Sequence, residues 1–210
     1  LANMIPTEIG LMTSLAIMYF HVNLLEGYIP SQVGALTAAT HMFWYSNKLS
    51  GTLPVELQHM SALKGLSLFN NKISGSLPTQ LGTMAALRNM HMYGNALTGP
   101  IPSEVGQLTL LLRMTLNNNN LSGEIPFEFG EMTSLIQLLL SDNLLQGQIP
   151  ASVAQLTAVT DMRLDNNLIT GADPALCSIT PTQLCTLSPN PRWDCSLSPP
   201  CLNAHVCTPP

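Results

Sequence analysis

The sequence is poor in charged residues, which make up 9% of the chain, whereas ordinary soluble domains carry about a quarter. Its seven lysines and arginines are scattered, and the formal net charge is −5. Nucleic acid is therefore excluded as an expected partner, because surfaces that bind it concentrate basic residues. The polar surface must come mainly from asparagine, serine, threonine and glutamine, which favours a regular architecture with few exposed charged helices.

Long apolar runs are missing as well. No segment approaches the roughly 18 to 20 apolar residues that a membrane-spanning helix needs. Nor does the chain open on a basic stretch followed by an apolar one, as a secretory signal peptide would. We expect a membrane to be involved only through segments outside this sequence. Apolar residues nevertheless make up 46% of the 210 residues, enough for one sizeable core.

Cysteine is absent before Cys177 and confined to the segment that follows, which is also rich in proline. Clustered cysteines in a terminal segment favour disulfides and an oxidising compartment. Because their number is odd, one thiol is free or has its partner outside this sequence. A zinc site that uses His205 is a weaker alternative, because the spacing lacks a CxxC pair. The cysteines are Cys177, Cys185, Cys195, Cys201 and Cys207, of which the last three would join His205 in that site.

Three residue types recur every 24 residues, as from Pro6 to Pro30, and keep fixed positions relative to one another. They are proline from Pro6 to Pro174, asparagine from Asn23 to Asn167 and glycine from Gly27 to Gly171. A period of this length indicates a solenoid, in which each coil buries its apolar face only against its neighbours.

Around each repeating asparagine the chain reads LxxLxLxxNxLxGxIPxxLGxL, as from Leu63 to Gly82. This pattern resembles the plant-type extracellular leucine-rich repeat (LRR) family, which includes receptor-like kinases, receptor-like proteins and polygalacturonase-inhibiting proteins. The resemblance covers residues 1 to about 177, and the L-x-G-x-I/L-P half distinguishes this subclass. It implies an α/β solenoid, a right-handed superhelix of 24-residue coils. Each coil would add a strand to a parallel concave sheet, a short strand to a second sheet, and a 3-10 or helical turn on the convex side.

We expect two parts, residues 1–176 as a solenoid of about seven full coils and residues 177–210 as a Cys/Pro-rich cap or tail. The repeating asparagines should pair with backbone groups where each strand ends, and methionines should replace leucines in the core. Because Leu1 falls in mid-repeat, we expect an N-terminal cap to be missing and the chain to be a fragment of a longer protein. The first coil should then expose Ile5, Ile9 and Met12.

The strand residues on either side of the second leucine position should face solvent on the concave sheet, because strand side chains alternate. Trp44, for example, should be buried, whereas Phe43 and Tyr45 should not. Aromatic residues are 5% of the chain and histidines number 5, yet they fill seven of the first eight such positions and none of the last six. Exposed aromatic clusters typically mark interaction sites, although stacking across strands could also explain them. The predicted ligand-binding residues are Tyr19, His21, Phe43, Tyr45, Phe69, His91, Tyr93, Arg113 and Arg163.

We expect no catalysis, no cofactor and no metal in the solenoid. Asp161 and Asp165 would lie about 13 Å apart along a strand, farther than the roughly 5 to 9.5 Å between the carboxylates of glycosidases. There is no GxSxG, HExxH or phosphate-binding glycine loop. With Arg113 and Arg163, these aspartates are expected to form a solvated ion-pair network of little energetic value, or else to orient a charged part of the ligand.

The sequence thus predicts an extracellular or cell-surface recognition module whose partner is a protein, peptide or glycan. Alternatives are an inhibitor of the polygalacturonase-inhibitor type, a spacer between domains, and a surface that binds ice or another lattice. The last rests on Ser50, Ser74, Thr98 and Ser122, an outward column of the second sheet that charged and bulky residues interrupt. The only N-x-S/T sequon, at residues 120–122, predicts glycosylation if the chain is secreted.

Overall fold

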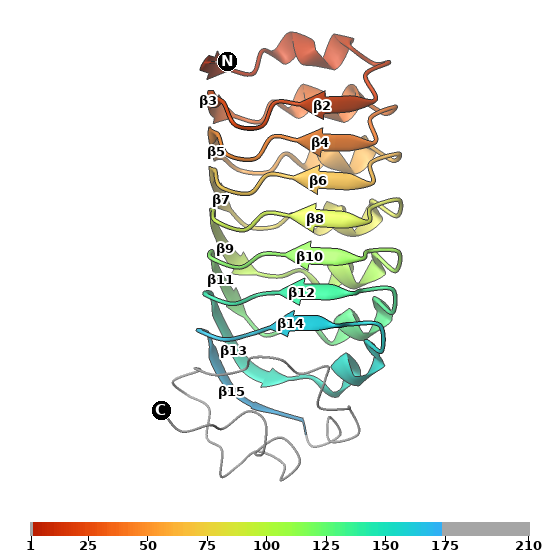
Figure 1. The fold of residues 1–210 in the computed structure, drawn as a ribbon, viewed down its shortest axis with the longest axis vertical. Coiled ribbons are helices and arrows are strands. Elements are labelled where there is room, and N and C mark those ends of the chain that lie inside the picture. Colours follow the sequence, from red (N-terminus) through yellow and green to blue (C-terminus); the bar gives the residue numbers. More distant parts are fainter. Residues whose placement is uncertain (1, 174–210) are drawn as a thin grey trace.

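The computed structural model describes residues 2–173, and in it the chain winds into a solenoid of stacked coils (Figure 1). Every coil repeats one path, a strand of the first sheet, a strand of the second sheet and a 3-10 helix. Neighbouring coils pair in parallel, and the first sheet keeps the register of the sequence repeat, so that Met18 lies opposite Met42 and Met42 opposite Leu66. The predicted solenoid is confirmed.

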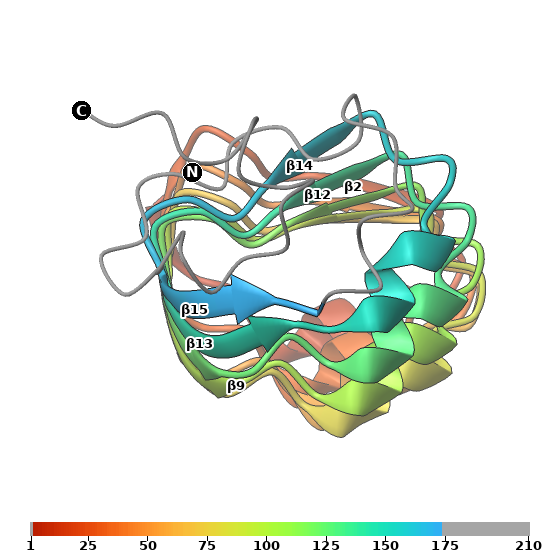
Figure 2. The ribbon, with the colours of Figure 1, turned by 90° about the horizontal axis from the view of Figure 1, so that it is seen from below.

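Two parallel sheets and a row of 3-10 helices form the walls of the solenoid (Figure 2). The seven-stranded sheet, in the order β14-β12-β10-β8-β6-β4-β2, consists of β2 (Ile17–Tyr19), β4 (His41–Phe43), β6 (Gly65–Ser67), β8 (Asn89–His91), β10 (Arg113–Thr115), β12 (Gln137–Leu139) and β14 (Asp161–Arg163). The eight-stranded sheet, in chain order, consists of β1 (Ala2–Met4), β3 (Leu24–Tyr28), β5 (Lys48–Gly51), β7 (Lys72–Gly75), β9 (Ala96–Pro100), β11 (Asn120–Gly123), β13 (Leu144–Ile149) and β15 (Leu168–Ala172). The 3-10 helices are η1 (Thr7–Leu11), η2 (Ser31–Ala35), η3 (Val55–His59), η4 (Thr79–Thr83), η5 (Ser103–Gln107), η6 (Phe127–Glu131) and η7 (Ala151–Gln155).

Columns of aliphatic and methionine side chains fill the interior. The methionines predicted for the core are buried in two columns, Met18, Met42, Met90, Met114 and Met162 in one and Met60, Met84 and Met132 in the other. Met12 is different, with 53% of its side chain exposed, because no described coil packs against its outer side. Methionine suits this interior because its flexible thioether fills irregular gaps.

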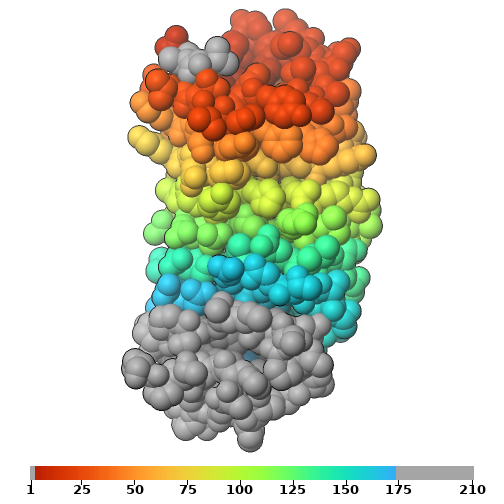
Figure 3. Space-filling view, viewed as in Figure 1, coloured from red at the N-terminus to blue at the C-terminus, as the bar shows by residue number. Residues whose placement is uncertain are grey.

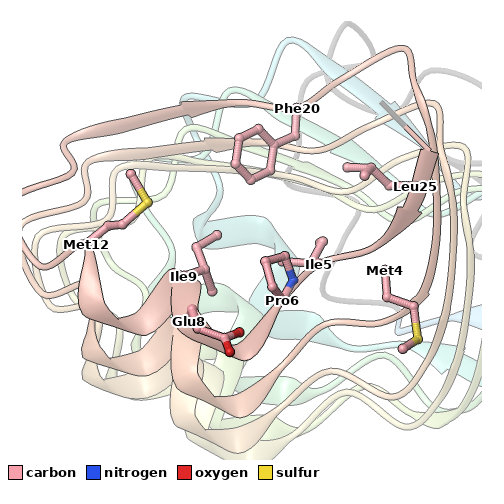
Figure 4. A pocket seen from close by; sticks show the side chains of 8 residues that line it. All are labelled: Met4, Ile5, Pro6, Glu8, Ile9, Met12, Phe20 and Leu25. Carbon is pink, nitrogen blue, oxygen red and sulfur yellow. The ribbon is translucent and has the colours of Figure 1, made fainter.

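The first coil is better packed than the sequence suggested. Met12 is exposed as expected, but the prediction that Ile5 and Ile9 are exposed is wrong, since only 6% and 5% of their surface is accessible. Both side chains point into the coil, on the side where Phe20 and Leu25 lie (Figure 4). The next coil, which contains Phe20 and Leu25, therefore covers them. The predicted boundary at residue 176 and the five cysteines lie outside the described residues.

A ladder of asparagines runs along the end of the seven-stranded sheet. Asn71 is typical: its Nδ2 donates to the carbonyl oxygens of Leu68 (2.9 Å) and Trp44 (3.1 Å), and its Oδ1 accepts from the amide of Leu49 (3.0 Å). One side chain thus satisfies backbone groups of its own coil and of the preceding one. Asn47, Asn95, Asn119, Asn143 and Asn167 repeat the arrangement. The predicted structural role is confirmed.

The residue before each ladder asparagine adopts a left-handed backbone conformation with φ between 52° and 65°. Asparagine, aspartate, serine and glycine tolerate this conformation, and they occupy the position in six coils, at Ser46, Asn70, Gly94, Asn118, Asp142 and Asn166. The exception is Val22, a β-branched residue with φ 53°. A β-branched side chain is strained there, so the first of these turns is less favourable than the others.

Candidate ligand-binding surface

Three columns of side chains point away from the core on the seven-stranded sheet, the face that Figure 3 presents as successive bands of colour. The alternation predicted for the strands is confirmed, because Trp44 is fully buried whereas Phe43 and Tyr45 are half-buried. The columns begin at Ile17, Tyr19 and His21, and each continues from coil to coil in the register of the paired strands. All nine predicted ligand-binding residues therefore lie on this one face.

The aromatic patch, which comprises Tyr19, His21, Phe43, Tyr45, Phe69, His91 and Tyr93, covers the first four coils of the sheet. Tyr19 is the most exposed member, at 63%, and the other members are half-buried. The predicted arginines lie farther along: Arg113 begins β10 and Arg163 ends β14. The structure thus gathers the seven rings and separates them from Arg163 by several coils.

Four rings of the patch form a continuous stack across neighbouring coils. The centroids of His21 and Tyr45 are 4.6 Å apart, those of Tyr45 and Phe69 4.3 Å and those of Phe69 and Tyr93 4.5 Å, with interplanar angles of 16°, 8° and 10°. These separations approach the spacing between strands, about 4.8 Å. Near-parallel rings with this spacing have planes that are roughly perpendicular to the solenoid axis. They therefore present ring edges to solvent, and their faces cover one another.

A second, smaller stack lies beside the first. Phe43 has Tyr19 on one side, at 5.4 Å and 14°, and His41 on the other, at 5.5 Å and 19°. His41 was not among the predicted residues, because only the two positions next to the second leucine were considered. Its signal was present in the sequence, since His41 lies two residues before Phe43 and must point to the same face.

Two titratable groups of the patch, His91 and Tyr93, are held in their neutral forms. Burial, and then the charge of Arg113, lowers the pKa of His91 below its usual value, so the imidazole is uncharged at neutral pH. Its Nδ1 lies 2.9 Å from the hydroxyl oxygen of Thr115. Burial, and then Tyr45, raises the pKa of Tyr93, which keeps that phenol protonated. The centre of this surface is therefore polar but uncharged.

The last three strands carry a different set of side chains. Arg163 Nε lies 3.1 Å from Asp161 Oδ1 in an ion pair whose side chains are 55% and 30% exposed. Exposed pairs of this kind contribute roughly 0 to 1 kcal/mol. Gln137 Nε2 donates to the other oxygen of Asp161 at 2.9 Å. Arg113 donates instead to Asn89 Oδ1, at 3.3 Å in the neighbouring coil, so the expected network is only partly formed.

A hollow of about 390 Å³ lies where the aromatic patch ends. It is lined by Phe69, His91, Tyr93, Thr115, Asn117, Gln137 and Leu139. Three of these residues belong to the patch, and the other four lie on the coils of β10 and β12. Sequence reasoning did not find this hollow, because it depends on the relative size of side chains in neighbouring coils.

An apolar cavity of about 320 Å³ lies at the first coil, between the side chains that Figure 4 labels. Met4, Ile5, Ile9, Met12, Phe20 and Leu25 form most of its lining. It offers apolar surface with a single carboxylate, Glu8. Residues of the first two coils line this cavity, which is separate from the hollow beside Tyr93.

Neither a metal cluster nor a membrane-spanning helix is found within residues 2–173. No three histidine, cysteine, aspartate or glutamate side chains in this range are grouped closely enough to hold a metal ion. The 3-10 helices are each five residues long, and none of the described helices is long and apolar enough to cross a bilayer. The alternative zinc site at Cys195, Cys201, His205 and Cys207 lies outside the described residues.

Comparison with known proteins agrees with this architecture. The model of the Leucine Rich Repeat family matches residues 62–84 and 110–132. The chain therefore contains leucine-rich repeats. No curated protein sequence is similar enough to this LRR chain to count as a match. Among solved structures, the LRR ectodomain of the Arabidopsis thaliana receptor kinase GASSHO1/SCHENGEN3, in complex with CASPARIAN STRIP INTEGRITY FACTOR 2, is 32% identical over 85% of the chain, with a TM-score of 0.82.

Two further structures mark the range of proteins with this LRR fold. The plant peptide hormone receptor RGFR1, in complex with RGF2, is 33% identical over 89% of the chain, with a TM-score of 0.84. A plant ice-binding protein is 25% identical over 85% of the chain, with a TM-score of 0.67. The chain spans 21% of the GASSHO1 structure, 30% of the RGFR1 structure and 66% of the ice-binding protein. The predicted resemblance to plant-type LRR ectodomains is confirmed.

Proposed function

We propose that this LRR solenoid is an extracellular, non-catalytic recognition module that binds a peptide, protein or glycan on the aromatic patch. The observation that carries the proposal is the gathering of seven rings, drawn from four separate coils, on one solvent-facing sheet. Contiguous exposed aromatic surface typically marks a site of interaction. Arg113 and Arg163 would extend the site and orient a charged part of a larger ligand.

The structural neighbours support the class of partner. RGFR1, a plant peptide hormone receptor, was solved with RGF2, and the neighbour HAESA with the peptide hormone IDA and the co-receptor SERK1. GASSHO1 was solved with CASPARIAN STRIP INTEGRITY FACTOR 2. A sheet that can be extended coil by coil suits an elongated ligand, because each coil adds three outward side chains. A peptide or protein loop is therefore the leading partner for the patch as a whole.

A library of displayed peptides and an array of glycans, both probed with the purified chain, test the proposal. We expect binders that are lost in the double variant Tyr19→Ser and Phe43→Ser, which removes rings from the sheet. A matched control is Phe127→Ser, because Phe127 is as exposed as Tyr19, at 65% against 63%, but lies on η6 on another wall. Absence of any binder, or equal loss in the control, would contradict the proposed site.

Binding to ice or another ordered lattice is a second candidate, favoured by the likeness to a plant ice-binding protein. The relevant surface is the outward column Ser50, Ser74, Thr98 and Ser122 of the eight-stranded sheet. Ser50 and Ser74 lie within 3.3 and 3.4 Å of the carbonyl oxygens of Gly27 and Gly51, so these hydroxyls are partly engaged with the preceding coil. Thermal hysteresis of the purified chain, lost in Thr98→Tyr, would establish this activity and displace the first proposal.

A further inference from the structure

The stack His21-Tyr45-Phe69-Tyr93 leaves one ring face uncovered toward the later coils. Tyr45 and Phe69 each have a ring against both faces, at 4.3 to 4.6 Å. Tyr93 has Phe69 on one face, and its other face is directed toward the coil of Asn117, the next residue of the same column. Since an asparagine is smaller than a ring, a hollow remains there, and Tyr93 and Asn117 both line it.

Ring edges and ring faces offer a ligand different chemistry. The face of an aromatic ring is electron-rich and its edge is electron-poor. The C–H groups on one side of a pyranose ring carry slight positive charge and form a flat apolar surface, which fits a ring face and not a row of edges. The hollow therefore combines an aromatic face with a lining that can receive a planar or saccharide group, whereas Tyr19, which is also stacked on one face only, lies outside it.

The polar groups of the hollow are neutral and include an unpaired amide. Asn117 makes no side-chain hydrogen bond within the described chain, and its Oδ1 is buried without a partner. An unpaired buried acceptor is unfavourable, and turning the amide toward the hollow would let a ligand donor reach it. Because Asn117 lines the hollow, rotation about the bond to its amide exchanges oxygen and nitrogen and presents either to a ligand. Thr115 and Gln137 supply further hydroxyl and amide groups.

Charge and size narrow the ligand class. Within residues 2–173, no charged side chain lines the hollow, and the pKa of His91 is lowered, so a carboxylate or ammonium group would find no counter-charge on the lining. The volume of about 390 Å³ falls in the range of roughly 300 to 1,000 Å³ that is usual for small-molecule sites.

Building on the proposed function, we propose that this hollow is a subsite for one residue of a neutral oligosaccharide. The sugar ring packs on the free face of Tyr93, and its hydroxyl groups bond to Asn117, Thr115 and Gln137. A peptide that crosses the patch instead would contact mainly ring edges and would have no need of the Asn117 amide.

Calorimetry with defined tetrasaccharides tests this inference. The probes are the neutral tetramers of β-1,4-linked glucose, xylose, mannose and N-acetylglucosamine, with tetragalacturonate as the charged comparison. We expect one or more neutral tetramers to bind and tetragalacturonate to bind more weakly. Tyr93→Leu and Asn117→Ala should each weaken binding about tenfold, equivalent to about 1.4 kcal/mol.

Phe127→Leu is the matched control, because it removes an exposed ring that lies on η6, outside the patch and the hollow. It should change the affinity less than about threefold, and the urea midpoint of each variant shows whether it is folded. Absence of binding by every neutral tetramer at 10 mM, or equal weakening by Phe127→Leu, would overturn the subsite. Binding of a displayed peptide to the patch without any saccharide binding would overturn the subsite while the proposed function stands.

Discussion

The two halves of the seven-stranded sheet have the same backbone and different surfaces. Strands β2 to β8 carry the aromatic patch, whereas β10 to β14 carry polar and charged side chains in the same three columns, with Leu139 as the exception. Strand pairing, register and the asparagine ladder continue unchanged across the boundary. The polar half thus shows that this sheet forms without stacked rings, so the rings of the first half are not required for the fold.

The largest expected effect concerns what the two halves share. Replacement of a ladder asparagine, Asn71→Ala in the ring-bearing half or Asn143→Ala in the polar half, leaves the backbone amide of Leu49 or Leu121 without its acceptor. It also removes one of the two asparagine donors from each of two carbonyl oxygens. At about 1 to 3 kcal/mol for the unpaired buried amide and about 0.5 to 1.5 kcal/mol for each further hydrogen bond lost, we expect each variant to lose on the order of 3 kcal/mol of unfolding free energy in urea.

The control for the ladder is Asn120→Ala, because Asn120 is exposed on the eight-stranded sheet. It should change the unfolding free energy by less than about 0.5 kcal/mol, as is usual for surface substitutions. If the two ladder variants differed from each other by more than about 1 kcal/mol, the claim that the halves share one scaffold would fail.

Among the turns that precede the ladder asparagines, one turn in the ring-bearing half carries a residue that disfavours the left-handed conformation. Val22 adopts a left-handed conformation in the first turn, where the polar half has Asn118, Asp142 and Asn166. Left-handed backbone costs an ordinary L-residue about 1 to 2 kcal/mol, so Val22→Asn should raise the unfolding free energy by about 1 kcal/mol. Val55→Asn, an exposed valine on η3, is the control and should not stabilise the chain. Equal melting temperatures for wild type and Val22→Asn would refute the assigned strain.

Ring stacking in the first half should be measurable as a coupling energy. A double-mutant cycle of Phe69→Leu and Tyr93→Leu should give about 0.5 to 1.5 kcal/mol of favourable interaction. The corresponding cycle of Asn117→Ala and Ser141→Ala, in the same column of the polar half, should give no coupling above the error. Similar values for the two cycles would mean that the rings do not interact beyond ordinary contact.

The smallest expected effect is a pH dependence at the boundary between the halves. The pKa of His91 is lowered in the folded chain, so the unfolded chain binds the proton more tightly. Neutral His91 therefore makes its full contribution to the unfolding free energy above about pH 6.5, the pKa of histidine in the unfolded chain. That contribution is lost as the pH falls through the pKa of His91 in the folded chain. The urea midpoint of His91→Gln should fall less between pH 7 and pH 5 than that of wild type.

A second histidine serves as the control for that measurement. His59→Gln, on η3 of the 3-10 helical wall, should retain the pH dependence of the wild type. Since Arg113 is the second cause of the lowered pKa of His91, Arg113→Gln should slightly reduce the pH dependence of the urea midpoint. An unchanged profile in His91→Gln would show that other groups are responsible.

Much of the fold could be predicted because the repeat constrains it. Columns of proline, asparagine and glycine at one spacing leave a solenoid as the consistent solution, and alternation then separates Trp44 from Phe43 and Tyr45. The packing of the first coil could not be read in this way. Whether Ile5 and Ile9 are buried depends on how Phe20 and Leu25, in the next coil, pack against them. The periodic sequence pattern is the same whether they are buried or exposed.

The candidate surface was predicted in position but not in detail. The repeat placed the rings on one face, yet it left open whether they lie flat or stack, because that choice depends on side-chain rotamers in neighbouring coils. His41 could have been included by extending the alternation two residues toward the start of its strand. The hollow beside Tyr93 could not be predicted, since it arises from the contrast in volume between a ring and the amide of Asn117.

The asparagine ladder also bears on how such a chain can change in length. Each ladder side chain connects its own coil only to the adjacent one, so a deletion or duplication of one whole repeat would leave every remaining connection intact. The gap between Tyr93 and the ion pair of Arg163 and Asp161 would then lengthen or shorten in steps of about 4.8 Å. Gain or loss of whole coils would thus let such proteins adjust the spacing of two recognition elements without redesigning either.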